Sequence, residues 1–144
     1  MDNKELIAEY PFLLPRNVFT DKVLDNYDYT YTLLDDMPKG WRLAFGEQMC
    51  KELKHVLIDE GFFGSYRVLQ IKEKFGQLRW YDNSGSEMLW KVISKYEALS
   101  EHTCIECGNK GRMMNIFGWI SPYCSKCYEK VNKRIQERLT KYSK

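Results

Sequence analysis

Four cysteines in the C-terminal third constrain the fold of this 144-residue chain more than any other feature. They form two Cys-x-x-Cys pairs, CIEC at 104–107 and CSKC at 124–127, with 16 residues between them. A two-residue spacer lets both thiolates of a pair point at one ion, and four thiolates complete the tetrahedral shell that zinc prefers. Because that shell has no open position for a substrate, we predict one structural zinc ion. Its four predicted ligands are Cys104, Cys107, Cys124 and Cys127.

Two other uses of these cysteines are weaker. Two disulfide bonds would suit a secreted protein, but the start MDNKELIAEYPFLLPRN has an acidic second residue and only a short apolar patch, unlike a signal peptide. No apolar run approaches the roughly 20 residues of a membrane helix, so we expect a cytoplasmic protein with no membrane partner. A nucleobase deaminase would need a His-x-Glu motif beside the zinc, and His102 in EHTC lacks that spacing.

The residues around the two pairs predict a knuckle, a hairpin and a helix, in an order that resembles a treble-clef zinc finger. Gly108 permits the tight turn of the knuckle, and RMMNIFGWISPY can form a short hairpin through Gly118. A helix over about 125–142 follows. Its apolar stripe comprises Tyr128, Val131, Ile135, Leu139 and Tyr142, and its basic residues are Lys126, Lys130, Lys133, Arg134, Arg138 and Lys141.

The residues before the cysteines predict an α+β core. Apolar residues recur at three- and four-residue steps over 38–60 and over about 86–102, which predicts two helices, the second with a Ser84–Glu87 capping box. Tyr27, Tyr29 and Tyr31 alternate with polar residues, which predicts a strand with the tyrosines on one face. We expect residues 1–102 to form this core with an N-terminal arm, and 103–144 to form the zinc finger and basic helix, packed on the core.

The stretch QIKEKFGQLRWY predicts a tight β-hairpin within 66–82, with Phe75-Gly76 as its turn. This small antiparallel sheet would be packed by the helices. Its core face would carry Leu69, Ile71, Leu78 and Trp80, and its other face Gln70, Lys72, Lys74, Gln77, Arg79 and Tyr81. In this register Lys72 faces Arg79, and like charges directly opposite each other destabilise a sheet. Either the pair lies on an exposed edge, where charge discourages strand addition, or an anion lies between the two cations.

The hairpin motif, the helix after it and the sequence EHTCIECG resemble those of an uncharacterised family of small bacterial and phage proteins. That family has a Lys-Glu-Lys-Phe-Gly-x-Leu-Arg-aromatic-Tyr signature followed by a Thr-Cys-x-x-Cys-Gly knuckle. The resemblance covers roughly residues 36–127 and includes DDMPKGW. It implies the hairpin and zinc-finger architecture and fits a phage origin, but it assigns no catalytic residue.

Charge is distributed unevenly along the chain. Residues 1–60 hold seven basic and twelve acidic residues, a net charge of −5, whereas residues 61–144 hold fifteen and eight, a net charge of +7. A basic C-terminal part favours an anionic partner. We see no nucleophile–base pair, phosphate loop or open metal site, so we do not expect an enzyme.

Capture of a phosphate-bearing ligand, most plausibly a small nucleotide, is the function we predict, and in a phage it would suit sequestration of a host nucleotide immune signal. The candidate ligand-binding residues are Lys72, Lys74, Arg79, Tyr81, Gln70 and Tyr29. Nucleic-acid binding through the basic helix over 125–142 is the alternative, and a protein-binding adaptor or inhibitor is a second one. The sequence leaves the oligomeric state open, including a homo-oligomer.

Overall fold

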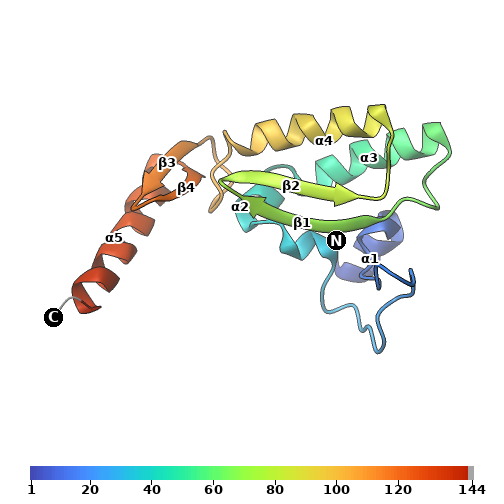
Figure 1. Cartoon of the computed structure of the whole chain (residues 1–144), viewed down its shortest axis with the longest axis horizontal. Coiled ribbons are helices and arrows are strands. Elements are labelled where there is room, and N and C mark those ends of the chain that lie inside the picture. The colour runs from blue at the N-terminus through green and yellow to red at the C-terminus, as the bar shows by residue number, and fades with distance from the viewer. Residues whose placement is uncertain (143–144) are drawn as a thin grey trace.

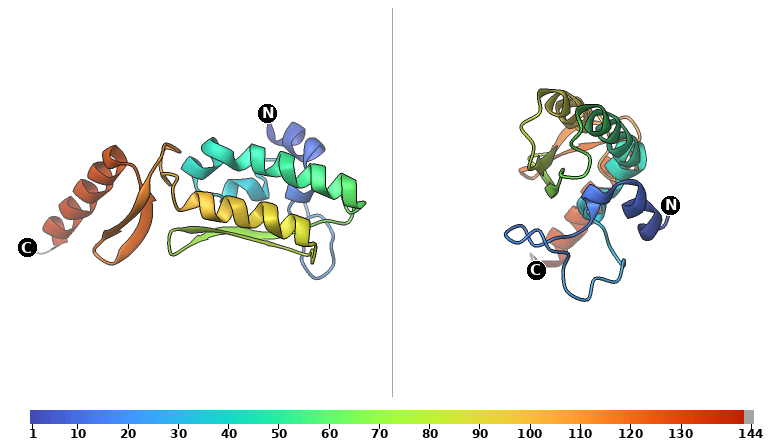
Figure 2. Two further views of the ribbon diagram at one scale, coloured as in Figure 1. Left: turned by 90° about the horizontal axis from the view of Figure 1, so that it is seen from above. Right: turned by 90° about the vertical axis from the view of Figure 1, so that its right-hand side faces the viewer.

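A β-hairpin and two helices build the main body of the protein (Figure 1). The computed structural model describes residues 1–142. Strands β1 (Val68–Lys74) and β2 (Gln77–Asp82) pair antiparallel, and helices α3 (Glu47–Glu60) and α4 (Glu87–Ser100) pack beside each other. In the right-hand view of Figure 2 the helices lie above and to one side of the hairpin, and none of the helices within residues 1–142 covers its other side. The predicted α+β class is confirmed.

The register of the hairpin confirms most of the predicted face assignment. Ile71 pairs with Trp80 on the buried face, and Lys72 pairs with Arg79 on the other face. The prediction that Leu69 belongs to the core is wrong, because it is 43% exposed while Val68 is buried. A register shift between Val68 and Gln70 is the physical reason, since one extra residue in a strand reverses the direction of the side chains before it.

Helix α4 covers the outer edge of β2. The backbone N–H of Leu78 donates to the hydroxyl of Ser100 at 3.0 Å, and the N–H of Trp80 donates to the carboxylate of Glu97 at 3.3 Å. Ser100 is fully buried and its hydroxyl donates in turn to the carbonyl of Glu97. The free N–H groups of this strand edge are therefore paired with the helix rather than exposed to solvent.

The N-terminal segment packs against the core. The buried apolar side chains of helix α1 (Asn3–Glu9) and of the 3₁₀ turn at Pro11–Leu13 include those of Leu6, Phe12 and Leu13. These side chains belong to the same cluster as the buried residues of the hairpin and of α3.

The predicted strand over the three tyrosines is wrong. Residues 27–31 form an irregular segment in which Tyr29 has a left-handed φ of 62°. The Asp28 carboxylate accepts hydrogen bonds from the backbone N–H and the hydroxyl of Thr30, and such local bonds compete with strand pairing. The rings of Tyr27, Tyr29 and Tyr31 nevertheless gather, with centroids 4.9 and 5.5 Å from that of Tyr27.

The helical region predicted over 38–60 is present but irregular. Helix α2 (Lys39–Trp41) continues through a π-helical turn at Arg42–Gly46 into α3, which ends at Gly61 with a φ of 77°. Pro38 precedes the first turn as its N-cap, and the left-handed glycine is a common helix end.

The predicted capping box of the second helix is wrong in position. The N-cap of α4 is Ser86, whose hydroxyl accepts from the N–H of Leu89, and the hydroxyl of Ser84 accepts from the N–H of Ser86. A second serine two residues later therefore takes the capping role, because Ser, unlike most residues, can cap wherever the chain enters the helix.

The C-terminal part has the predicted order of knuckle, hairpin and helix. Strands β3 (Arg112–Ile116) and β4 (Trp119–Tyr123) pair antiparallel, and α5 (Ser125–Tyr142) follows. Figure 1 shows α5 extending away from α3 and α4, and none of the described residues of α5 is buried. Within residues 1–142, no helix is long and apolar enough to cross a membrane.

Candidate metal centre and anion-binding face

The four cysteines of the knuckle and of the first turn of α5 meet at one point. Their sulfur atoms all lie within 4.8 Å of one another. The sulfurs of Cys107 and Cys124 are 3.7 Å apart, close to the roughly 3.8 Å expected between two ligands of a tetrahedron with Zn–S bonds of about 2.3 Å. The same distance is far too long for a disulfide bond of about 2.05 Å. The donor set and its spacing fit one tetrahedral metal ion.

A backbone N–H favours the metal-binding form of one of these sulfurs. The N–H of Cys127 donates to the sulfur of Cys124 at 3.4 Å, and this hydrogen bond lowers the pKa of the Cys124 thiol to about 7. The N–H of Gly108 closes the knuckle by donating to the carbonyl of Cys104, with a left-handed φ of 83° at the glycine. A thiolate is the form that binds a metal, so the lowered pKa of Cys124 favours binding, whereas burial raises the pKa of the Cys127 thiol and opposes its deprotonation.

The knuckle is joined directly to the core. The N–H of Gly40 donates to the carbonyl of Ile105 at 3.0 Å, and the indole N–H of the fully buried Trp41 donates to the carbonyl of Thr103 at 2.9 Å. A methyl group at Gly40 would lie only 2.3 Å from the carbonyl oxygen of Cys104. Only a residue without a side chain permits this approach, which fixes the cysteine cluster relative to the hairpin.

The predicted anion-binding residues of the hairpin lie together on its uncovered face. Gln70, Lys74 and Tyr81 are exposed, and Lys72 and Arg79 are half-buried. The ammonium of Lys72 lies 5.7 Å from the centroid of the Tyr81 ring, a cation–π contact. Among the described residues, no carboxylate comes within 4.0 Å of Lys72, Lys74 or Arg79, although several other cations of the chain have such a partner.

Arg79 occupies an unusual position within this face. Its Nε atom is buried and has no hydrogen-bond partner in the protein. Arg79 interacts electrostatically with Glu97, which is partly buried where α4 meets β2. Burial raises the pKa of Glu97, while its hydrogen bond from Trp80 and the charge of Arg79 lower it, and burial dominates. A buried guanidinium N–H without an acceptor is costly, and because protein covers this atom, an outside acceptor reaches it only if the side chain moves.

The state of Glu97 gives a prediction about pH. Because its pKa is raised in the folded protein, the ionised carboxylate costs stability at pH 7, and this cost disappears as the pH falls through that pKa. Glu97→Gln keeps an acceptor for the N–H of Trp80, so its melting temperature should exceed that of the wild type at pH 7. The difference should shrink toward pH 4. Thermal melts of both proteins at each pH measure this difference in melting temperature. A loss of metal at low pH would affect both proteins equally and would not change the difference.

Tyr29 lies in a different group of contacts. Its carbonyl accepts from the side-chain amide of Asn3, and the ammonium of Lys4 lies 5.6 Å from the centroid of its ring. These contacts join Tyr29 to α1 and to Tyr27, not to the hairpin. The structure therefore gives no support to stacking by Tyr29 beside Tyr81.

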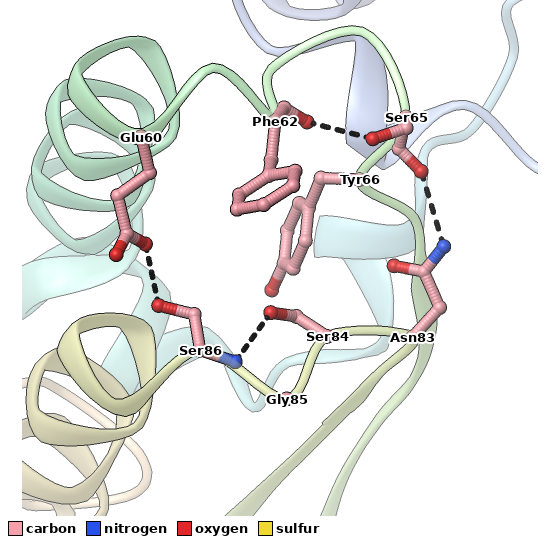
Figure 3. A pocket seen from close by; sticks show the side chains of 8 residues that line it. All are labelled: Glu60, Phe62, Ser65, Tyr66, Asn83, Ser84, Gly85 and Ser86. Atoms are coloured by element: carbon pink, nitrogen blue, oxygen red, sulfur yellow. Dashed lines mark hydrogen bonds between the residues drawn. The ribbon is translucent and has the colours of Figure 1, made fainter.

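A cavity of about 420 Å³ lies at the end of the core where α3 ends and α4 begins (Figure 3). Its polar groups are mostly paired with one another: the Ser86 hydroxyl donates to Glu60, the Ser65 hydroxyl to the carbonyl of Phe62, and the Asn83 amide to the carbonyl of Ser65. None of the five cavities that we describe includes a candidate residue of the hairpin face. Three of the candidate residues on that face, Gln70, Lys74 and Tyr81, are exposed to solvent.

Comparisons with known proteins add no further assignment. No protein-family model matches the chain, and neither a curated protein nor a solved structure is significantly similar to it. The four-cysteine cluster is the part of the family resemblance that the structure supports.

Several residues of this region could not be chosen from the sequence. Glu97 and Ser100 meet β2 only because α4 folds back along its edge. Gly40 was part of the DDMPKGW stretch, but nothing in that stretch indicates that the knuckle packs against it. The Phe-Gly dipeptides at 75–76 and 117–118 indicate the turns of the two hairpins, but the sequence does not show that the two phenylalanines are exposed.

Proposed function

We propose that this protein binds a phosphate-bearing ligand of the nucleotide class on the uncovered face of the β1–β2 hairpin, without catalysing a reaction. The observation that supports this most is the opposed Lys72–Arg79 pair, in which neither cation has a carboxylate within 4.0 Å among the described residues. A phosphate between the two cations would relieve their repulsion and accept from the guanidinium. Charge-assisted hydrogen bonds of this kind are among the strongest that a protein makes.

The neighbours of this pair suit a nucleotide. Tyr81 and Gln70 pair across the strands one position beyond Ile71 and Trp80, and Tyr81 is exposed for contact with a base. Lys74 adds a cation near the turn. Protection of a sheet edge is a weaker explanation for Arg79, because α4 already covers the edge of β2.

We propose further that the four cysteines bind one structural zinc ion. Four thiolates satisfy zinc without an open coordination position, and the cluster lies where knuckle, hairpin β3–β4 and α5 meet. In this account the ion organises the C-terminal part and takes no part in binding the ligand.

Arg79→Ala tests the proposed function. Because the change removes the repulsion with Lys72 and the unpaired N–H together, the melting temperature of the free protein should stay the same or rise. Affinity for a fluorescent 5′-phosphorylated dinucleotide, measured by fluorescence anisotropy, should fall by about 1.5–3 kcal/mol, the scale of a hydrogen bond to a charged group.

Lys51→Ala is the matched control, since it removes one exposed cation from α3 and should leave the affinity unchanged. Two outcomes would contradict the proposal. Unchanged dinucleotide affinity of Arg79→Ala would show that the face binds no phosphate. A marked loss of stability without ligand would show that Arg79 serves the fold, held by Glu97.

A further inference from the structure

The two hairpins of this protein end in the same unusual turn. Phe75-Gly76 connects the paired residues Lys74 and Gln77, and Phe117-Gly118 connects Ile116 and Trp119. All four turn residues have positive φ angles: 53° and 79° in the first turn, and 52° and 87° in the second. Two-residue loops with positive φ at both positions are type I′ turns.

Phenylalanine is a poor choice for the first position of such a turn. Asn, Asp and Gly are preferred there, and a bulky residue in the left-handed region is strained. Burial does not account for the choice, because Phe75 is 73% exposed and Phe117 is 69% exposed. Trp119, directly after the second turn, is 60% exposed. Residues that break a local rule without a gain in packing tend to serve function.

The first turn lies against the hairpin that carries the second turn. A methyl group at Gly76 would be 2.3 Å from the Cε of Met113 and 3.2 Å from the carbonyl oxygen of Ile120, so the first turn rests on hairpin β3–β4. The left-hand view of Figure 2 shows the turn of β1–β2 and the tip of β3–β4 on the same side of the molecule. The turn that carries Phe75 therefore adjoins the hairpin whose tip carries Phe117 and Trp119.

Charge on the adjoining part of the chain is positive. Residues 103–142 carry eight basic and three acidic residues, and the ammonium of Lys74 lies 5.7 Å from the centroid of the Phe75 ring. Alternating cations and exposed aromatic rings on an open surface are the features by which proteins hold single-stranded nucleic acid. A duplex cannot offer the faces of its bases to such rings, because its bases already stack on each other.

We propose that the ligand of this surface is a single-stranded nucleic acid that runs from the β1–β2 face across both turns. Its phosphates contact Lys72 and Arg79, and its bases stack on Phe75, Phe117 and Trp119. The inference rests on the proposed function for its phosphate contact, and it adds the ligand class and the three stacking residues. A single strand can lie along an exposed face, whereas a small nucleotide usually binds in a pocket that encloses it.

Phe75→Asn and Phe117→Asn test the stacking role. Because asparagine suits the first position of a type I′ turn, both variants should melt at the same temperature as the wild type or higher. Affinity for a fluorescent single-stranded DNA 12-mer, measured by anisotropy at 100 mM salt, should fall roughly 5- to 150-fold per lost stack. Phe75→Tyr and Phe117→Tyr keep an aromatic ring and should keep the affinity.

Phe19→Asn is the matched control, because Phe19 is almost fully exposed but lies in the N-terminal segment. It should not change binding of the 12-mer. If the asparagine variants melt at a lower temperature than the wild type, the Phe75→Tyr and Phe117→Tyr variants decide the question. A stacking role predicts that the tyrosine variants keep their affinity for the 12-mer.

The outcomes separate this inference from the proposed function. Both stand if the turn variants weaken only the 12-mer while Arg79→Ala weakens the 12-mer and the dinucleotide. Turn variants that bind the 12-mer normally overturn the inference and leave the function intact if Arg79→Ala still weakens the dinucleotide. A duplex 12-mer or heparin that binds as tightly as the single strand overturns the inference, in favour of a general polyanion or acidic-protein surface.

Discussion

Cys107→Ser should unfold the C-terminal part of the protein and leave the helix–hairpin core folded. Among residues 1–142, the apolar cluster around the cysteines contains three buried residues, Cys104, Ile116 and Tyr123, and α5 buries none of its described residues. So small a core needs the metal, and binding of a structural zinc contributes on the order of 10 kcal/mol to such modules. Hydrogen exchange should show protection lost over residues 103–142 and retained in α3, α4 and β1–β2.

Elemental analysis provides the corresponding count of metal. We expect one zinc per chain in freshly purified wild-type protein and none in Cys107→Ser. Cys50→Ala is the matched control, because Cys50 is buried in the core cluster and far from the four clustered sulfurs in sequence and packing. It should lose some stability but keep its zinc. Wild-type protein without metal would contradict the account of the C-terminal part.

Gly40→Ala should detach the knuckle from the core. The added methyl group would lie 2.3 Å from the carbonyl oxygen of Cys104 and 2.6 Å from the backbone of Ile105, and these backbone atoms cannot turn away as a flexible side chain could. Overpacking of this kind costs roughly 1–3 kcal/mol, and more where backbone has to move. Chemical denaturation should show the loss, together with a weaker hydrogen bond from Gly40 to Ile105 in amide exchange.

Gly64→Ala makes the same chemical change where no atom lies within 4 Å of the added methyl group. It should leave the free energy of unfolding within about 0.5 kcal/mol of the wild type, as ordinary surface substitutions do. Equal stability of Gly40→Ala and the wild type would mean that the knuckle does not pack against α2 as described.

Local patterns predicted much of this fold. The spacing of the two Cys-x-x-Cys pairs correctly predicted that the four cysteines cluster. Three- and four-residue periodicity predicted α3 and α4. The Phe75-Gly76 turn predicted the register in which Lys72 lies opposite Arg79. Each of these features depends on residues that are near in sequence or whose geometry is set by a turn or a metal. The same holds for the knuckle, hairpin and helix order of the C-terminal part.

The errors arose where a local bond or a distant contact decided the structure. One extra residue near Val68 exposed Leu69, and the hydrogen bonds of Asp28 prevented the expected tyrosine strand. The surroundings of Arg79 could not be predicted, because Glu97 reaches β2 only through the packing of α4 along its edge. Alternating sequence patterns identify faces of strands, but they do not show which partner covers an edge.

The central claim is that the cation pair on the uncovered hairpin face binds phosphate. A ¹H–¹⁵N NMR titration with an unlabelled 5′-phosphorylated dinucleotide tests it most directly, with the Arg79 Nε–H signal assigned by its loss in Arg79→Lys. We predict that this signal and the backbone amides of Lys72 and Arg79 shift progressively and saturate, while the amide of Lys51 stays in place. A titration in which the Arg79 Nε–H signal does not move, or in which shifts are confined to α5, would contradict the claim.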